Sequence, residues 1–90
     1  MRNKVLVIED NADLAQILPM HLSDAGMDVE VAIDGRSGLE RASQGGIDLI
    51  ILDLILPEVG GIEICRRLRT ASIYTPILIE ERLIVPQAVV

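Results

Sequence analysis

Apolar residues along the 90-residue chain form continuous runs separated by helix-spaced sets. The runs at 5–8, 47–52 and 76–79 predict strands that are buried on both faces, as in a parallel sheet. Residues 28–31 alternate polar and apolar side chains. That alternation predicts a half-exposed strand at a sheet edge, where charges discourage pairing with other chains.

Three helices are predicted between these strands. The first is indicated by apolar residues at helical spacing: Leu14, Ile17, Leu18, Leu22 and Ala25. A second, shorter helix passes through Leu39 and Ala42, after a turn marked by Asp34-Gly35. The third has its predicted inner face at Ile64, Cys65 and Leu68. Each helix therefore connects two consecutive strands.

The order β-α-β-α-β-α-β predicts one α/β domain with a parallel sheet and right-handed crossovers. The strand at 28–31 is polar on one face, whereas the other three strands are apolar throughout. The polar strand should therefore lie at an edge, which gives the spatial strand order 2-1-3-4. In such a sheet, ligands bind beyond the carboxyl ends of the strands, where the strand order reverses.

Composition and charge exclude several classes of protein. The net charge of −6 and the pI near 4.5 argue against a nucleic-acid or anionic-membrane surface. One cysteine, Cys65, rules out an internal disulfide and a multi-cysteine metal site. No run approaches the roughly 20 apolar residues of a membrane helix. A cytoplasmic protein is the simplest interpretation, and Arg66, Arg67 and Arg69 are interpreted as a solvated helix end.

Carboxylates follow two of the buried strands. Glu9 and Asp10 follow the strand at 5–8, and Asp53 follows the strand at 47–52. Neighbouring strands lie about 4.8 Å apart, so these like charges should be close and should repel. A hard cation such as Mg²⁺ removes the conflict, and a carboxylate beside it can act as a nucleophile toward phosphorus. The alternative is that Asp10 or Asn11 merely caps the following helix.

Two segments, residues 5–10 and 48–61, resemble the receiver domain of bacterial two-component response regulators. The second segment follows the family pattern Asp-x-x-Met/Leu-Pro-x-Met-Asp-Gly, with Gly60 standing where Asp is common. The resemblance covers roughly residues 4–79 and implies a flavodoxin-like fold.

The resemblance also implies a function. Asp53 would accept a phosphoryl group from a sensor histidine kinase or a small phosphodonor. Glu9, Asp10 and Asp53 would bind Mg²⁺, with the backbone carbonyl of Ile55 completing the metal site. Such a domain assists its own phosphorylation and is not an enzyme acting on other substrates.

The chain departs from the family after residue 79. Glu81 takes the position of a Ser or Thr, or Glu80 does if the register slips, and an ionised carboxylate cannot donate to a phosphate. The family's phosphate-pairing lysine has no match, because Lys4 is the one lysine of the chain. The usual fourth helix, fifth strand and fifth helix also lack counterparts. Residues 1–80 are therefore interpreted as an incomplete receiver, followed by an apolar tail at 81–90.

This tail could form a hairpin or pair with another chain, and without a fifth strand the strand at 76–79 would be an exposed apolar edge. The alternative function is therefore a non-signalling receiver remnant that forms a homo-oligomer through this strand and the tail. A phosphatase of the aspartyl-phosphate type fits less well, because Glu9-Asp10-Asn11 lacks its two aspartates separated by one residue. A redox role for Cys65 and a phosphohistidine role for His21 are weaker alternatives.

Overall fold

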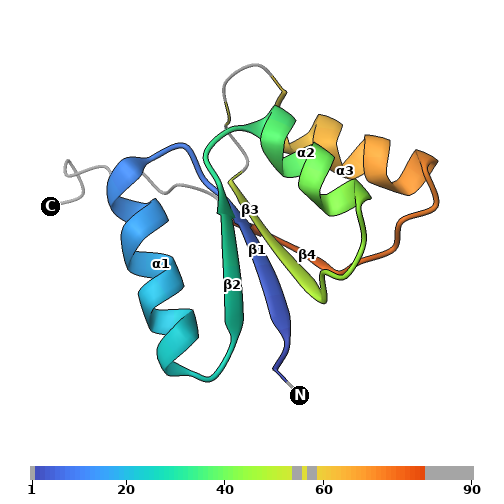
Figure 1. Cartoon of the computed structure of the whole chain (residues 1–90). Helices are drawn as coiled ribbons and strands as arrows, with labels where there is room; N and C mark the ends of the chain where they lie inside the picture. The colour runs from blue at the N-terminus through green and yellow to red at the C-terminus, as the bar shows by residue number, and fades with distance from the viewer. Residues whose placement is uncertain (1, 54–55, 57–58, 81–90) are drawn as a thin grey trace, which may run out of the picture.

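The computed structural model describes residues 2–53, 56 and 59–80. Strands and helices alternate along this part of the chain, as the hydrophobic pattern predicts (Figure 1). In chain order the elements are β1 (Lys4–Ile8), α1 (Ala12–Asp24), β2 (Asp28–Ala32), α2 (Gly35–Ser43), β3 (Leu49–Asp53), α3 (Gly61–Thr70) and β4 (Ile77–Glu80).

The four strands form one parallel sheet in the order β2-β1-β3-β4, which confirms the predicted order. Helix α1 lies on one face of the sheet, whereas α2 and α3 lie on the other (Figure 1). The two faces of the sheet are therefore covered unequally.

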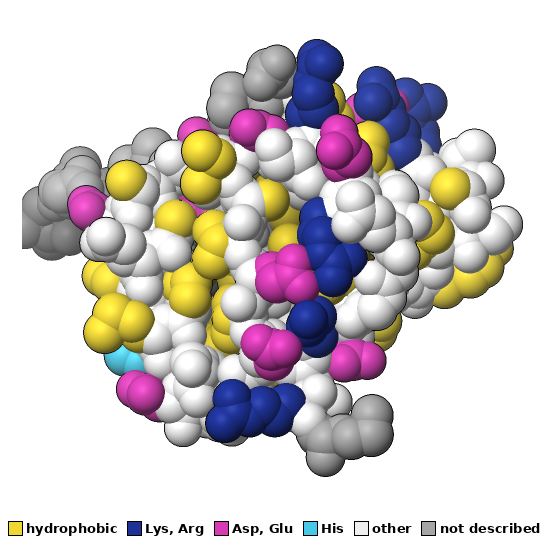
Figure 2. Space-filling model, viewed as in Figure 1, with side chains coloured by type: hydrophobic (Ala, Val, Ile, Leu, Met, Phe, Trp, Pro, Cys, Tyr) yellow, Lys and Arg dark blue, Asp and Glu magenta, His cyan; other side chains and the backbone are white. Residues whose placement is uncertain are grey.

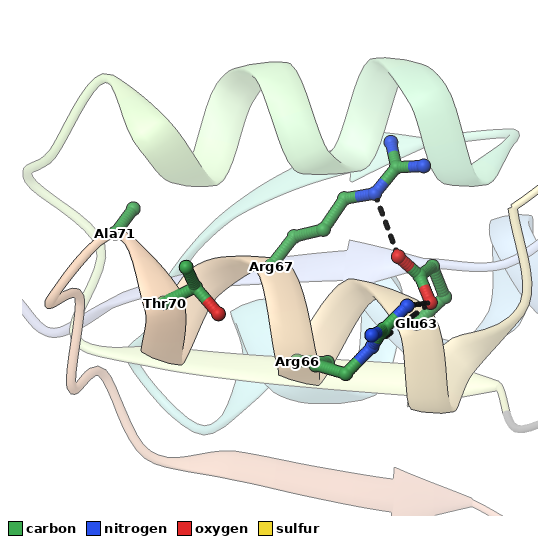
Figure 3. A pocket seen from close by; sticks show the side chains of 5 residues that line it. All are labelled: Glu63, Arg66, Arg67, Thr70 and Ala71. Carbon is green, nitrogen blue, oxygen red and sulfur yellow. Dashed lines mark hydrogen bonds and ion pairs between the residues drawn. The ribbon is translucent and has the colours of Figure 1, made fainter.

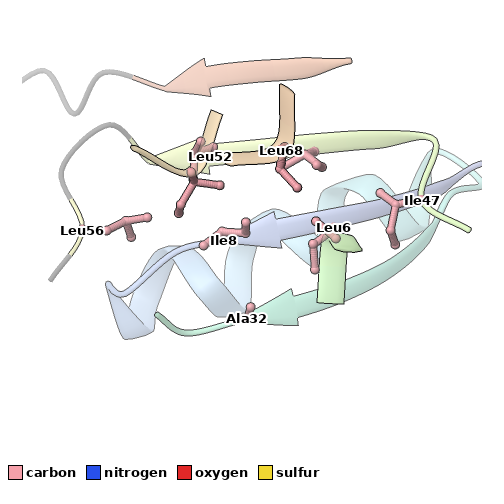
Figure 4. Close-up of a cluster of buried hydrophobic side chains, with 10 residues drawn as sticks. Leu6, Ile8, Ala32, Ile47, Leu52, Leu56 and Leu68 are labelled. Atoms are coloured by element: carbon pink, nitrogen blue, oxygen red, sulfur yellow. The ribbon is translucent and has the colours of Figure 1, made fainter. Parts of the chain in front are cut away.

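The main hydrophobic core lies between the sheet and the pair α2 and α3 (Figure 4). Its buried members are aliphatic: Leu6, Ile8, Ala32, Ala42, Ile47, Ile50, Leu52, Leu56, Ile64 and Leu68. Ile47 was predicted to open the third strand, but the strand begins at Leu49. Ile47 is nevertheless buried and belongs to the main core, although it lies in the segment before the strand.

A smaller cluster lies under α1, where Val5, Val7 and Ile51 are buried and Leu18 and Leu22 pack against them. No residue of α1 itself is buried, and Ile17, predicted to face inward, is 48% exposed. The helix lies mainly against β2 and β1. The helical period was predicted correctly, and the period alone does not set how deeply each residue is buried.

Asparagine and aspartate side chains begin two of the helices. The Asn11 side chain accepts hydrogen bonds from the backbone N–H groups of Asp13 (2.9 Å) and Leu14 (3.1 Å), so Asn11 rather than Asp10 caps α1. The Asp34 side chain accepts from the N–H of Ser37 at 2.7 Å. The predicted turn at Asp34 is therefore the N-cap of α2.

Charged side chains protect the outer edge of the sheet at β2. The Glu30 carboxylate accepts hydrogen bonds from Arg41 Nε at 2.7 Å and Nη2 at 2.9 Å, and Lys4 Nζ lies 3.2 Å from it. Acidic and basic side chains gather over β2 and α2 in Figure 2. Hydrogen bonds from Arg41 and Lys4 lower the pKa of Glu30 to about 2.

The close approach of α2 to β1 at Gly38 predicts the effect of one added methyl group on stability. A Cβ at Gly38 would lie 2.5 Å from Cδ1 of Ile8, which is fully buried and cannot move aside. We expect Gly38→Ala to lower the free energy of unfolding by about 1–3 kcal/mol in urea titrations, despite the better helix propensity of Ala. Gly60→Ala is the matched control, because no atom lies within 4 Å of its Cβ position. Equal stability of the two variants would contradict this packing.

The Glu30 ion pairs predict a pH dependence of stability. The pKa of Glu30 is about 2 in the folded chain against an ordinary value of 4.5, so the stabilisation is fully present above about pH 4.5 and is lost as the pH falls toward 2. We expect the free energy of unfolding of the wild type to exceed that of Glu30→Gln by up to about 1 kcal/mol at neutral pH. The difference is this small because the ion pair is partly solvated. Urea titrations from about pH 6 to 2 should show the difference shrinking in that window. A difference that is independent of pH would contradict the assignment.

Candidate functional site

The pairing of β1 with β3 creates a cluster of carboxylates at one rim of the sheet. Ile8 lies opposite Leu52 in the parallel register, and the next residues of the two strands are Glu9 and Asp53. The N–H of Glu9 donates to the carbonyl of Ala32 at 2.9 Å, so the backbone of Glu9 is still held by the neighbouring strand β2. Both carboxylates therefore start from rigid backbone rather than from a loop.

Asp10 joins these two residues in what we call the acidic cluster: Glu9, Asp10 and Asp53. Each of the three contributes a carboxylate oxygen, and these oxygens lie within 4.8 Å of one another. Glu9 and Asp53 are each 2% exposed, whereas Asp10 is exposed. The cluster thus has a buried base and one member at the surface, which leaves a path to it from solution.

The first turn after β1 orients one carboxylate of the acidic cluster. The N–H of Asn11 donates to Oε2 of Glu9 at 3.2 Å, and the Asn11 side chain caps α1. This role of Asn11 was not predicted, although a carboxylate two residues before a free N–H is a known local pairing. The start of α1 therefore fixes the direction of the Glu9 side chain.

The donor set of the acidic cluster is chemically uniform. All three side chains offer ionisable oxygens, and the cluster contains no thiol or imidazole. Three hard oxygen ligands suit Mg²⁺, which takes one or two carboxylates and completes an octahedron with waters or phosphate oxygens. Among the described residues, no other group of three acidic, histidine or cysteine side chains has this proximity.

The remaining predicted site residues are placed only in part. Ile55 and Glu81 lie outside the described residues, as does the tail at 81–90. Glu80 ends β4 and lies opposite Asp53 in the register of β3 with β4. Cys65 packs partly buried against the main core, and His21 lies in the last turn of α1. Neither residue belongs to the acidic cluster.

A pocket beside α3 is lined by Glu63, Arg66, Arg67, Thr70 and Ala71 (Figure 3). Glu63 accepts hydrogen bonds from Arg66 and from Arg67 Nε, the latter at 2.9 Å. These arginines lower the pKa of Glu63 and are themselves engaged within one helix. This pairing agrees with their interpretation as a solvated helix end.

The part of the chain that the structure describes has no helix with the length and apolarity needed to span a bilayer.

Comparison with known protein families gives a match over most of the chain. Residues 5–80 match the model of the response regulator receiver domain. The response regulator ArlR of Staphylococcus saprophyticus is 43% identical over 76 residues, which cover 84% of this chain and 34% of that protein. The chain therefore spans about a third of the length of the curated relatives it matches.

Solved structures give the same result for the fold. The receiver domain of the Francisella response regulator 1452 superposes with a TM-score of 0.87 at 31% identity, over 97% of this chain and 72% of that one. The chemotaxis response regulator CheY4 of Vibrio cholerae superposes with a TM-score of 0.83 at 37% identity, over 88% of this chain and 68% of that one.

The acidic cluster predicts that removing one charge stabilises the protein in the absence of metal. We expect Asp53→Asn to raise the free energy of unfolding in chelator-treated buffer by about 1–4 kcal/mol. The lower figure is the repulsion of two like charges ~4 Å apart in bulk water, and the higher figure is the same repulsion near a protein surface. Urea titrations would measure the change. Asp24→Asn, an exposed aspartate at the end of α1, is the control and should have little effect. A destabilised Asp53→Asn would contradict mutual repulsion in the cluster.

Proposed function

The chain belongs to the response regulator receiver domain family, and from this we propose that residues 1–80 act as a phosphoacceptor module of a two-component phosphorelay. In this proposal Asp53 receives the phosphoryl group. A sensor histidine kinase or a small phosphodonor supplies it, in the cytoplasm. The domain assists its own modification and does not turn over another substrate.

One observation carries the proposal: three carboxylates at the carboxyl ends of two adjacent strands converge within 4.8 Å at one rim of the sheet. An oxygen of Asp53 would attack the phosphorus atom, and the bond from phosphorus to the donor's nitrogen or oxygen would break. The leaving group keeps the electron pair of that bond, and Asp53 becomes an acyl phosphate. The strand end holds the nucleophile in place, which favours an in-line approach.

Glu9 and Asp10 would hold Mg²⁺ beside Asp53, with the carbonyl of Ile55 as a further ligand. Bound there, the ion supplies charge neutralisation for the transferring phosphoryl group. Glu9 is suited to this role because its carboxylate is buried and is oriented by the N–H of Asn11. Asp10 is suited because it is exposed, so it can meet an ion that still carries most of its waters.

Lys4 does not replace the phosphate-pairing lysine of the family. Its ammonium group lies 3.4 Å from Asp28 and 3.2 Å from Glu30 at the start of β1. The acidic cluster follows the opposite end of that strand, roughly 15 Å away at about 3.3 Å per residue. Lys4 is thus held by acidic residues at the end of the sheet that lies away from Asp53.

The exposed edge of the sheet supports a second candidate function, self-association. Leu78 is 55% exposed and Ile79 is 41% exposed on β4, a strand that pairs on one side with β3. A strand whose outer side has no partner among the described residues, and whose apolar side chains are exposed, favours pairing with another chain. Phosphorylation requires Asp53, whereas self-association requires β4, so the two functions can be tested separately.

Intact mass spectrometry tests the phosphoacceptor function. We expect the chain to gain the mass of one phosphoryl group when incubated with Mg²⁺ and a small acyl phosphate, because Asp53 is the nucleophile. Asp53→Asn should gain none, and Asp10→Asn should gain it at least about tenfold more slowly through weaker metal binding.

Asp24→Asn is the matched control and should behave as the wild type. The proposal fails if folded wild type gains no mass, or if Asp53→Asn gains as much as the wild type does. Circular dichroism of each sample would establish that it is folded.

A further inference from the structure

The basic side chains of this acidic chain are concentrated in one layer of the fold. Helices α2 and α3 together carry five arginines and two glutamates, a net charge of +3, whereas the whole chain has a net charge of −6. The remaining residues therefore carry −9. Lys and Arg side chains gather over α2 and α3 at the upper right of Figure 2. An anion in solution is thus attracted to this layer more than to the rest of the protein.

Within this layer, one pocket has a defined set of lining residues. The α3 pocket, as we call it, is lined by Glu63, Arg66, Arg67, Thr70 and Ala71. These residues are spaced three and four apart, so they form one row along the helix. The volume of the pocket is about 300 Å³, at the lower end of the range for small-molecule sites. The pocket therefore has room for a small ligand.

Glu63 orders the two arginines of the α3 pocket. Its Oε1 accepts hydrogen bonds from Nε of Arg66 at 3.1 Å and from Nη2 of the same residue, and its Oε2 accepts from Nε of Arg67 at 2.9 Å. One carboxylate therefore lies between two guanidinium groups, and the three groups together carry +1. Because the arginines are ordered before a ligand binds, binding costs less side-chain entropy.

The pairing with Glu63 leaves the outer donors of both arginines unused. Arg67 bonds through Nε alone, and its two terminal nitrogens point away from Glu63 in Figure 3. Within the described part of the chain, no acceptor bonds to those two nitrogens or to Nη1 of Arg66. Each guanidinium has five N–H groups, so the pair still offers most of its donors to a ligand.

The Thr70 hydroxyl adds a neutral donor to the same row. In α2, the Ser43 hydroxyl donates to the carbonyl of Leu39 at 2.8 Å, a common bond for such a side chain within a helix. The Thr70 hydroxyl makes no comparable bond to any described residue. The α3 pocket therefore presents donors from three side chains, of which two are cationic.

We propose that the α3 pocket binds a phosphate group, either as inorganic phosphate or as the monoester of a small molecule. The outer N–H groups of Arg66 and Arg67 and the Thr70 hydroxyl would hold it. A phosphate monoester carries about −1.5 to −2 at pH 7 and has three strong acceptor oxygens, so it matches both the charge and the three donor side chains. A carboxylate has one charge and two coplanar oxygens, so it matches less of the pocket.

The segment that follows β4 complements this pocket less well than phosphate does. Residues 81–90 carry one negative charge, on Glu81, and one positive charge, on Arg82, among uncharged residues. Such a segment brings no net negative charge to two arginines. Charge complementarity therefore favours a small anion as the occupant.

The α3 pocket is distinct from the acidic cluster. Helix α3 follows β3 and runs back toward the opposite end of the sheet, so Thr70 lies roughly 14 Å along the helix from Gly61. A phosphate bound there is therefore not the group that Asp53 would receive. This inference does not rest on the proposed phosphoacceptor function.

Titration with inorganic phosphate, followed by two-dimensional ¹H–¹⁵N NMR, tests the site. The buffer contains a chelator and no Mg²⁺, and the ionic strength is held constant near 0.15 M. We expect saturating shifts confined to residues 63–71, including the Nε–H signals of Arg66 and Arg67, with a Kd on the order of 1 mM. The affinity is modest because the pocket is open to water and the dipole of α3 disfavours an anion near its C-terminal end.

Three variants test the individual donors. Arg67→Gln removes a charged donor group and should weaken phosphate binding at least about tenfold. Arg67→Lys keeps the charge but not the planar fork, and it should weaken binding about threefold or more. Thr70→Val removes the hydroxyl at nearly constant volume and should weaken binding about threefold.

Arg69→Gln is the matched control, because it makes the same charge change on the same helix outside the pocket. Nη1 of Arg69 donates to the carbonyl of Ile73 at 2.7 Å, and Arg69 does not line the α3 pocket. Screening at this ionic strength should keep its effect on phosphate affinity below about twofold. Circular dichroism would establish that every variant is folded.

Two further ligands define the class of anion and its source. Acetate should bind at least about tenfold more weakly than phosphate, because it has fewer charges and oxygens. Glycerol phosphate should bind at least as tightly as inorganic phosphate if the physiological ligand is a monoester, and more weakly if it is phosphate itself. Either order supports the phosphate site and identifies the source of the group.

Three results would overturn the inference. The first is the absence of saturating shifts at residues 63–71 up to about 20 mM phosphate, which is also the result expected if another segment of the chain fills the pocket. The second is an equal loss of affinity in Arg69→Gln and Arg67→Gln, which would indicate diffuse charge. The third is equal binding of acetate and phosphate. In each case Asp53 could still gain a phosphoryl group with Mg²⁺ and an acyl phosphate, so the two proposals fail separately.

Discussion

The parallel pairing of β1 with β3 is the constraint on which the rest of this structure depends. Both strands are apolar, so both must be covered on their two faces, and their acidic residues can lie only at or beyond their carboxyl ends. The register that places Ile8 opposite Leu52 then brings Glu9 and Asp53 to one rim. The same contacts that build the core therefore bring together charges that repel.

That repulsion links stability to ligand binding. Buried carboxylates weaken a fold unless something neutralises or hydrogen-bonds them, and the N–H of Asn11 supplies one such hydrogen bond to Glu9. A cation that binds the folded chain stabilises it by mass action, and a phosphoryl group changes the charge at the same place. A site of this kind would respond to ions and to phosphate, because its like charges lie close together.

The sequence predicts the features that depend on local pattern. Apolar runs located the strands, the polar alternation placed β2 at an edge, and the paired carboxylates located the acidic cluster. Features that depend on tertiary distance were missed. The ion pair of Glu30 with Arg41 joins a strand to a helix 11 residues away. Ile17 belongs to the apolar stripe of α1 and is nevertheless 48% exposed, because helical spacing gives direction but not how much sheet lies beneath.

Strand β4 reaches the rim where the acidic cluster lies. It is held by β3, and its last residue, Glu80, lies in register with Asp53. Among the described residues β4 has a strand partner on one side, so its backbone is less restrained than that of β1, which has partners on both. A strand that paired with its outer side would restrain β4 on both sides as well. The position of the residue opposite Asp53 would then be set by contacts along the whole strand, so any such partner would act on the rim through the backbone of β4.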